Sequence, residues 1–344
     1  MTEDSSPASH LSVAMTTTGM TQITGGNTVI SSSSPRGIEF YFQIAVLMIG
    51  VVGTAANALV LYALVVSKQH KKHVLIVHQN ALDLFTSFSM IVTYTTRLCN
   101  VPLTGSVGYW LCTMMLSDCF IMFGTIASAI NLAIVTVERY LKVVHPVWSQ
   151  NRLRSWMIYL AMVTACIISF INNIAVVFPT SGVIDGICYA HRIWNNKAAS
   201  MFYFIWNFVA FYLITIFVFV FCYWRIIVVI RRQARVMASH AADRSSAAQN
   251  QYNQIQSNVI KTMIIVSTSF AILWLPAYIH FMIQTLTPYP IQQDGMFYAG
   301  LLLAHSYMCI NPYIYASNLD PVRQVLLRLI SCKKTSQQAA GNVA

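Results

Sequence analysis

Charged residues are scarce in this chain. They make up 9% of its 344 residues, with 10 acidic side chains against 21 basic ones, whereas a soluble globular domain carries roughly 25%. This scarcity excludes an ordinary water-soluble domain, and the mean hydropathy of +0.59 indicates a membrane protein. A bilayer core about 30 Å thick needs roughly 20 apolar residues per helix, so apolar stretches of that length are expected.

Patterns of catalytic chemistry are missing too. The sequence has neither an HExxH motif nor the paired Cys and His spacing of a zinc site, and His280 and His305 lie on different apolar stretches. We therefore expect neither an enzyme nor a bound metal cofactor. The first 34 residues lack a basic segment followed by a compact apolar run, so no signal peptide is expected. Their Ser, Thr and Gly content predicts a disordered extracellular tail over residues 1–37.

The chain does have a series of long apolar stretches. Seven of them meet the length of a membrane-crossing helix: Ile38–Val66, Val74–Thr96, Leu111–Val135, Ser155–Phe178, Ser200–Ile230, Val259–Leu286 and Met296–Ala316. They lack the alternating pattern of membrane β-barrel strands. We therefore predict an all-α fold, a bundle of seven transmembrane helices over residues 38–317.

Basic residues predict the orientation of this bundle. If the N-terminus lies outside, the outer segments carry four basic residues (Arg36, Arg97, Arg192 and Lys197), and the inner segments carry the other 17. This bias predicts an extracellular N-terminus, a cytoplasmic C-terminus and a place in the plasma membrane. Anionic membrane lipids are the partners that account for the formal net charge of +11, so nucleic acid is not expected as a partner.

Several polar side chains lie deep inside the apolar stretches. Asn57 and Asp83 are each about ten residues from the inner end of their helix, which places them at a depth of about 15 Å. Ser128 reaches a similar depth, and Asn311 precedes Pro312 in the last stretch. We expect Asn57, Ser128 and Asn311 to form one polar layer with Asp83, together with water or Na⁺, because polar partners lower the cost of burying a carboxylate. The alternative for Asn57 and Ser128 is that they satisfy neighbouring backbone groups.

Short motifs follow one another in order along these stretches. They are "GTAANALV" (Gly53–Val60), "NALDL" (Asn80–Leu84), "ERY" (Glu138–Tyr140), "LWLP" (Leu273–Pro276) and "NPYIY" (Asn311–Tyr315). With these motifs the chain from about Ile38 to Cys332 resembles the rhodopsin-like (class A) G-protein-coupled receptors, and in character the invertebrate orphan and neuropeptide-receptor-like members. The resemblance implies a receptor that binds an extracellular ligand and promotes nucleotide exchange on the Gα subunit of a heterotrimeric G protein. The rival hypothesis is a seven-span transporter or channel.

The resemblance also implies an activation switch. Glu138 is expected to hold Arg139 at rest, and Arg139 is expected to line the Gα cavity with Tyr223 after the sixth helix moves outward. Pro276 is expected to kink that helix. The switch and coupling residues are Glu138, Arg139, Tyr140, Pro146, Val147, Tyr223, Gln256, Trp274, Pro276, Asn311, Pro312 and Tyr315.

One switch position departs from many relatives, which carry an acid there. Gln256 lies eighteen residues before Trp274, on the same face of the sixth helix. A neutral amide offers Arg139 a hydrogen bond about half as strong as a charge-assisted one. We therefore predict basal signalling that Gln256→Glu lowers.

Cysteines and the C-terminal segment complete the expected architecture. The family bridge implies a disulfide between Cys112 and Cys188, with Cys99 as the competing partner for Cys188. The spacing of apolar residues predicts an amphipathic eighth helix over residues 318–332, where Cys332 is a candidate palmitoylation site. A short cytoplasmic tail over residues 333–344 follows, and arrestin is a further candidate partner.

Two positions narrow the ligand class. His305 stands where opsins carry the retinal lysine, so retinal is not expected, and Ile121 or Cys119 stands where amine receptors carry an aspartate. A neuropeptide is preferred because the expected pocket mixes aromatic and amide side chains, although aromatic residues also anchor helices at the membrane interface. The candidate pocket residues are Tyr94, Asp118, Cys119, Tyr203, Trp206, Asn207, Tyr278, Phe281, Gln284, Tyr298 and His305. Tyr307 and Met308 depart from the family by replacing small polar residues of its sodium site.

Overall fold

The computed structural model describes residues 36–71, 73–191, 193–194, 196–239, 247–287, 295–318 and 322–328. The long helices are α1 (Arg36–Val66), α2 (Val74–Leu98), α4 (Cys119–Val144), α6 (Ser155–Thr180), α8 (Ile214–Ser239), α9 (Ala247–Leu286) and α10 (Gly295–Asn318). Shorter elements are α3 (Gly105–Trp110), the π-helices η1 (Leu111–Leu116) and η2 (Phe208–Leu213), α5 (Pro146–Arg152) and α7 (Lys197–Asn207). Residues 322–328 form one more helical segment.

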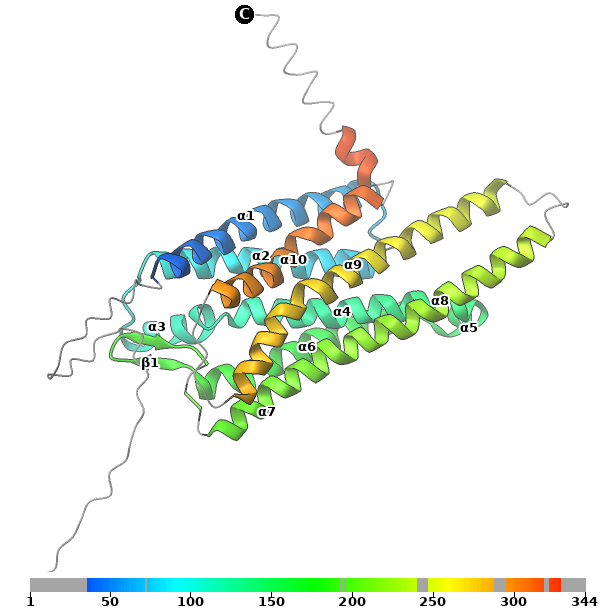
Figure 1. Ribbon diagram of the computed structural model, residues 1–344. Coiled ribbons are helices and arrows are strands. Elements are labelled where there is room, and N and C mark those ends of the chain that lie inside the picture. The colour runs from blue at the N-terminus through cyan, green and yellow to red at the C-terminus, as the bar shows by residue number, and fades with distance from the viewer. Residues whose placement is uncertain are drawn as a thin grey trace, which may run out of the picture. The chain divides into compact units, whose positions relative to one another are not determined.

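The long helices pack into one bundle with α4 at its centre. Figure 1 shows them side by side, running along a common direction. Helix α4 contacts α2, α6 and α8, α1 contacts α2 and α10, and α9 contacts α10. Their shared core is made of apolar side chains such as Leu132, Ile226 and Met263, each fully buried.

Six helical segments within the described residues are long and apolar enough to cross a membrane. They correspond to the first six predicted spans. Helix α10 corresponds to the seventh; it is 24 residues long and packs in the same bundle. Polar residues such as His305 and Asn311 lower its hydropathy, and both of these side chains are buried against neighbouring helices.

Two predicted spans are built from several helical segments. The third, expected over Leu111–Val135, extends from Gly105 to Val144 and combines α3, η1 and α4. It is interrupted at Asp118, whose φ of 57° lies in the left-handed region, and α4 begins at the next residue. The fifth combines α7, η2 and α8. The π-helices could not be read from the apolar pattern, because an extra residue in one turn leaves the length and hydropathy of a span unchanged.

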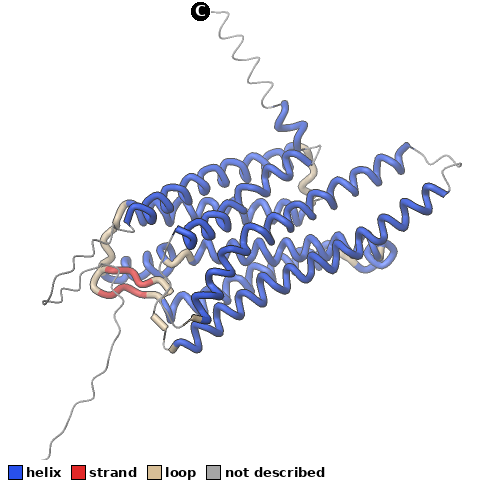
Figure 2. Tube along the Cα trace, viewed as in Figure 1, coloured by secondary structure: helices blue, strands red, loops and turns tan. Residues whose placement is uncertain are grey.

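A short hairpin adds two strands to the helical bundle. Strands β1 (Gly182–Ile184) and β2 (Ile187–Tyr189) pair antiparallel, with Val183 opposite Cys188. Their two-residue turn, Asp185-Gly186, has positive φ at both residues, the conformation that Asp-Gly favours in tight hairpins. Figure 2 shows the hairpin at one end of the bundle. We call this the disulfide end, and the opposite end, about 30 Å away along α4, the Arg139 end.

Candidate functional site

The Arg139 end carries a cluster of charges on one helix. Arg139 Nε lies 3.0 Å from Glu138 Oε2, and the other oxygen of Glu138 pairs with Lys142 Nζ. The Glu138 side chain is nearly buried, whereas Lys142 is the most exposed of the three. All three residues belong to α4. Within the described residues, the ion pairs by which Glu138 neutralises Arg139 and Lys142 therefore stay within α4.

Links between helices near this end run through a tyrosine hydroxyl. Tyr223 Oη of α8 lies 3.0 Å from Thr136 Oγ1 of α4 and 2.9 Å from Ser267 Oγ of α9. All three side chains are buried. Tyr223 thus joins three helices by uncharged hydrogen bonds, a connection that sequence reasoning did not find. Tyr315, another of the predicted switch residues, is also buried.

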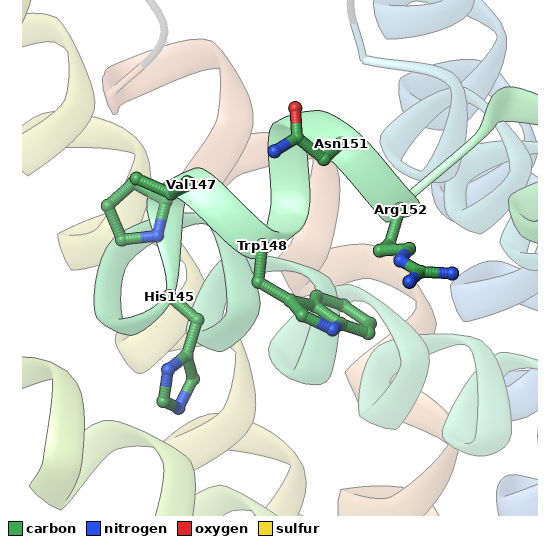
Figure 3. Close-up of a pocket in the computed structure, with 6 residues that line it drawn as sticks. His145, Val147, Trp148, Asn151 and Arg152 are labelled. Carbon is green, nitrogen blue, oxygen red and sulfur yellow. The ribbon is translucent and has the colours of Figure 1, made fainter.

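The turn that follows α4 presents an exposed apolar surface. Pro146 begins α5, Val147 is 72% exposed and Trp148 is 47% exposed. Together with His145, Asn151 and Arg152, they line a shallow hollow of about 470 Å³. Figure 3 shows Trp148 and Arg152 one turn apart on α5, with Asn151 pointing away from them. Tyr140 anchors this turn, because its ring packs against His145 at a centroid distance of 5.7 Å.

Trp274 and Pro276 lie in the middle of the bundle on α9. Trp274 is buried and packs between Phe270 and Tyr278, at centroid distances of 6.3 and 5.9 Å. Pro276 lies inside the helix, where it removes a backbone hydrogen bond. Figure 1 shows that α9, the helix that contains Pro276, bends along its length. The bend agrees with the predicted kink.

The polar layer surrounds Asp83. Its Oδ1 accepts hydrogen bonds from Ser128 Oγ at 2.8 Å and Gln79 Nε2 at 3.3 Å, and its Oδ2 accepts one from Asn311 Nδ2 at 2.8 Å. Each of these side chains is at most 1% exposed. The structure thus brings Ser128 and Asn311 to Asp83, as expected from their depth. Helices α2, α4 and α10 are joined at this point.

Asn57 takes the alternative role. Its Nδ2 donates to the carbonyl oxygens of Gly53 and Met308, at 2.9 and 3.0 Å. It therefore links α1 to the backbone of α10 and does not extend the layer around Asp83. The reason is local: its amide satisfies a carbonyl of its own helix, one turn earlier, at the same time as the carbonyl of α10.

Sequence reasoning missed two members of the layer, Gln79 and Asn131. Asn131 Nδ2 donates to Gln79 Oε1 at 2.8 Å, and both side chains are fully buried. A helical signal was present, because Gln79 precedes Asp83 by four residues and Asn131 follows Ser128 by three, which places each pair on one helix face. What brings the two faces together is Gly124, where an added Cβ would overlap Thr86 Oγ1.

At the disulfide end, covalent and charged links join different elements. Cys112 and Cys188 form a disulfide with a Cα–Cα distance of 5.5 Å, and Cys99 is an exposed free thiol. This confirms the Cys112–Cys188 pairing over the alternative with Cys99. Arg97 of α2 forms a 2.8 Å ion pair with Asp118, at the start of α4.

His191, two residues after β2, adds a contact with the segment just before α4. Its Nε2 lies 3.0 Å from the Ser117 carbonyl oxygen, and its backbone N–H donates to Ser181 Oγ. Burial lowers the pKa of the His191 imidazole, although the Ser117 carbonyl and the Asp118 charge act in the opposite direction. The neutral ring is therefore favoured, with a proton on Nε2 for the Ser117 carbonyl.

Seven of the candidate pocket residues belong to two aromatic groups. In the first, Tyr94 and His305 pack at a centroid distance of 6.4 Å, Phe42 packs 4.9 Å from Tyr298, and Arg97 lies over the Tyr94 ring at 4.7 Å. Asp118 belongs to this group through Arg97. The group lies where α1, α2 and α10 meet.

The second group lies between α7, η2 and α9. Phe281 stacks on Phe204 at 5.8 Å, Tyr203 packs against Phe204 at 5.5 Å, and Tyr278 packs against Tyr212 at 4.6 Å. Cys119 is buried at the start of α4.

Two pocket candidates on α7, Trp206 and Asn207, form hydrogen bonds with α6. Asn207 Oδ1 accepts from Asn172 Nδ2 at 3.1 Å, and Trp206 Nε1 donates to Asn172 Oδ1 at 3.3 Å. Trp206 is half exposed.

The side chains of three predicted site residues lie outside the described residues. Gln256 and Gln284 belong to α9, but their side chains are outside the described residues, and Cys332 lies beyond the last described segment. The roles of Gln256 and Cys332 and the place of Gln284 in the pocket remain predictions. The helical segment 322–328 lies within the predicted eighth helix; its Val322 is buried and its Leu327 is half exposed.

Comparisons with known proteins agree with this arrangement. The family described as "7 transmembrane receptor (rhodopsin family)" matches residues 56–315. Galanin receptor type 1 of Rattus norvegicus is 22% identical over 322 residues, which cover 89% of this chain and 87% of the relative. Somatostatin receptor type 3 of Homo sapiens is 23% identical over 303 residues, covering 83% and 68%. Substance-P receptor of Aquarana catesbeiana is 23% identical over 293 residues, covering 82% and 68%.

A solved structure shows the same fold. The crystal structure of squid rhodopsin aligns with a TM-score of 0.70 at 15% identity, over 87% of this chain and 88% of that one. The fold and the buried site define a multi-pass membrane receptor. This chain belongs to the rhodopsin family of seven-transmembrane receptors. It is a receptor and not an enzyme, and the transporter or channel hypothesis finds no support in these matches.

Proposed function

We propose that this receptor, G-protein-coupled by family, binds an extracellular peptide at the disulfide end and promotes nucleotide exchange on Gα at the Arg139 end. The three relatives described above are receptors named for galanin, somatostatin and substance P. Their shared ligand class supports a peptide ligand. The distribution of basic residues supports a plasma-membrane location with the disulfide end outside the cell.

The observation that carries the coupling proposal is the environment of Arg139. Within the part of the chain that the structure describes, its ion-pair partner is Glu138 on the same helix. Movement of α9 away from α4 therefore breaks a hydrogen bond of Tyr223 and, within the described residues, no ion pair between these helices. The Arg139 side chain can then face a cavity that admits the end of a Gα helix. The exposed Val147 offers an apolar contact beside that cavity.

The disulfide end suits a peptide for a chemical reason. Its two aromatic groups offer apolar faces, and Arg97 with Asp118 offers one cationic and one anionic side chain that are partly exposed. A peptide carries both aromatic side chains and charged or amide groups. Anionic lipids around the basic segments and arrestin at the Arg139 end are further proposed partners.

The test is a peptide-library screen read out by GTP loading on a panel of Gα subunits. Once an agonist is found, Arg139→Ala should reach the cell surface normally and lose most agonist-driven loading. Arg154→Ala is the matched control, because Arg154 is an exposed basic residue at the same end, and it should load normally. Normal loading in Arg139→Ala would remove Arg139 from the mechanism. Solute flux or current in reconstituted bilayers, without GTP loading on any Gα, would overturn the receptor proposal.

A further inference from the structure

Hydrogen bonds run in one direction from α6 to the Asp83 carboxylate. Cys166 Sγ lies 3.8 Å from His78 Nε2, and His78 Nδ1 donates to Asn131 Oδ1 at 2.9 Å. Asn131 Nδ2 donates to Gln79 Oε1 at 2.8 Å. At the other end of its amide, Gln79 Nε2 donates to Ser128 Oγ and, at 3.3 Å, to Asp83 Oδ1. At the end of this series, the N–H₂ group of Gln79 lies beside the buried carboxylate of Asp83.

The orientation of the Gln79 amide is fixed by its neighbours. Turning it around would place its carbonyl oxygen against the Asp83 carboxylate, and its N–H₂ group against the N–H₂ group of Asn131. Both contacts are repulsive, and leaving a buried polar group without a partner destabilises the fold. Asn131 is held in turn by His78 and by the Leu75 carbonyl oxygen, to which its Nδ2 donates at 3.2 Å.

This donor set does not fit the sodium ion considered for the layer. A hard cation takes oxygen ligands such as carboxylates, carbonyls and water. Here the Asp83 oxygens accept hydrogen bonds from Gln79, Ser128 and Asn311, and the Ser128 oxygen accepts one from Gln79 as well. The positive ends of these N–H and O–H dipoles point to where a cation would have to bind. At the two positions where the family carries small polar residues of its sodium site, this chain has Tyr307 and Met308, which are bulky and each 1% exposed.

We propose that the Gln79 amide takes the position beside Asp83 that a sodium ion would need, so that the buried layer of this receptor is indifferent to sodium. Neutral hydrogen-bond donors from α2, α4 and α10 stabilise the negative charge of the Asp83 carboxylate in place of a cation. The proposal concerns the resting fold and does not depend on the ligand or on Gα coupling. It also identifies the substitution that would open the site, because Leu at position 79 has no donor to offer.

The test is thermal unfolding of the purified full-length receptor in NaCl and in KCl at matched ionic strength. The wild-type midpoint should be the same in both salts. Gln79→Leu should gain a saturable sodium-specific rise of roughly 1–2 °C once sodium exceeds its Kd about fivefold. Adding Asp83→Asn to Gln79→Leu is the matched control and should abolish that rise, because the carboxylate is then gone.

Two results would overturn the proposal. One is a saturable rise in the wild-type midpoint that sodium causes and potassium does not. The other is a folded Gln79→Leu variant that stays indifferent to sodium, which would show that another group excludes the ion. If Gln79→Leu does not fold, Gln79→Met, which is unbranched like glutamine, replaces it under the same criteria. Sodium-23 NMR line broadening on the wild-type protein is a test that does not depend on the Gln79 variants. Sodium line broadening that is lost in Asp83→Asn contradicts the proposal, and the absence of broadening in the wild type supports it.

Discussion

The two ends of the bundle are held together by different kinds of bonds. At the disulfide end, a covalent bond joins Cys112 to Cys188 of the hairpin, and an ion pair joins Arg97 of α2 to Asp118. Near the Arg139 end, the ion pairs of Glu138 with Arg139 and Lys142 stay within α4, and the hydrogen bonds of Tyr223 join the helices.

This difference separates a fixed end from one that can open. A disulfide contributes about 2–4 kcal/mol to stability, and charge-assisted hydrogen bonds are about twice as strong as neutral ones. A neutral buried hydrogen bond contributes only about 0.5–1.5 kcal/mol. Helices α8 and α9 can therefore move from α4 near Arg139 at a small cost in free energy, while the disulfide end keeps its shape around a ligand.

Loss of the disulfide should have the largest effect on the difference between the two ends, because it removes the covalent bond of the disulfide end. Cys188→Ser should lower the free energy of unfolding by about 2–5 kcal/mol and reduce surface delivery, because the hairpin is then no longer tied to η1. Surface labelling and thermal unfolding measure both effects. Cys99→Ser is the control and should behave as wild type, since Cys99 is an exposed free thiol. Full surface delivery of Cys188→Ser, or a Cys99–Cys188 peptide found by mass spectrometry, would contradict the assignment.

The ion pair at the disulfide end should rank second. Asp118→Asn should cost about 1–3 kcal/mol of unfolding free energy, because it leaves Arg97 partly buried without its counter-charge. The matched variants are Arg97→Gln alone and together with Asp118→Asn. If the pair links α2 to α4 as the structure shows, the double variant should lose less than the sum of the two single losses. Simple additivity would mean that the two charges are not coupled.

Release of Tyr223 should raise basal activity at the opposite end. Ser267→Ala removes one neutral hydrogen bond between α8 and α9, worth about 1 kcal/mol, and should raise basal GTP loading about fivefold at matched surface expression. Ser306→Ala is the control, because its hydroxyl bonds a carbonyl oxygen within α10. Unchanged basal loading in Ser267→Ala would show that Tyr223 does not restrain α9.

The smallest effect is expected at Lys142. Lys142 competes with Arg139 for Glu138, so Lys142→Ala should leave Glu138 to Arg139 alone and lower basal loading about twofold, the size of an i,i+4 ion pair of about 0.3–0.5 kcal/mol. Lys142→Arg keeps the charge and should match the wild type. An increase in basal loading for Lys142→Ala would mean that Lys142 restrains the switch by another contact.

Local sequence signals were enough for much of the fold and part of the site. The apolar stretches predicted the six helices that are long and apolar enough to cross a membrane, and also helix α10. The expected polar layer grouped Asp83 with Ser128 and Asn311, which are its hydrogen-bond partners in the structure. The hairpin was missed, although Asp185-Gly186 is a turn signal, because strands of three residues carry too little alternation to be recognised. Gln79 and Asn131 were missed because a glutamine or asparagine in a helix has no fixed partner until the neighbouring helix is placed.

Hydropathy and the helical rise of about 1.5 Å per residue act locally along the chain, so the amino-acid sequence was enough to predict which segments cross the membrane and which residues lie at the same depth. Tertiary structure alone decided which side chains bond to one another. That choice depends on how each helix is rotated and how closely it approaches its neighbour, as at Gly124, where α2 and α4 come together. For this reason the sequence places Gln79 one helical turn before Asp83, while the packing of α2 against α4 decided that the N–H₂ end of the Gln79 amide faces the carboxylate.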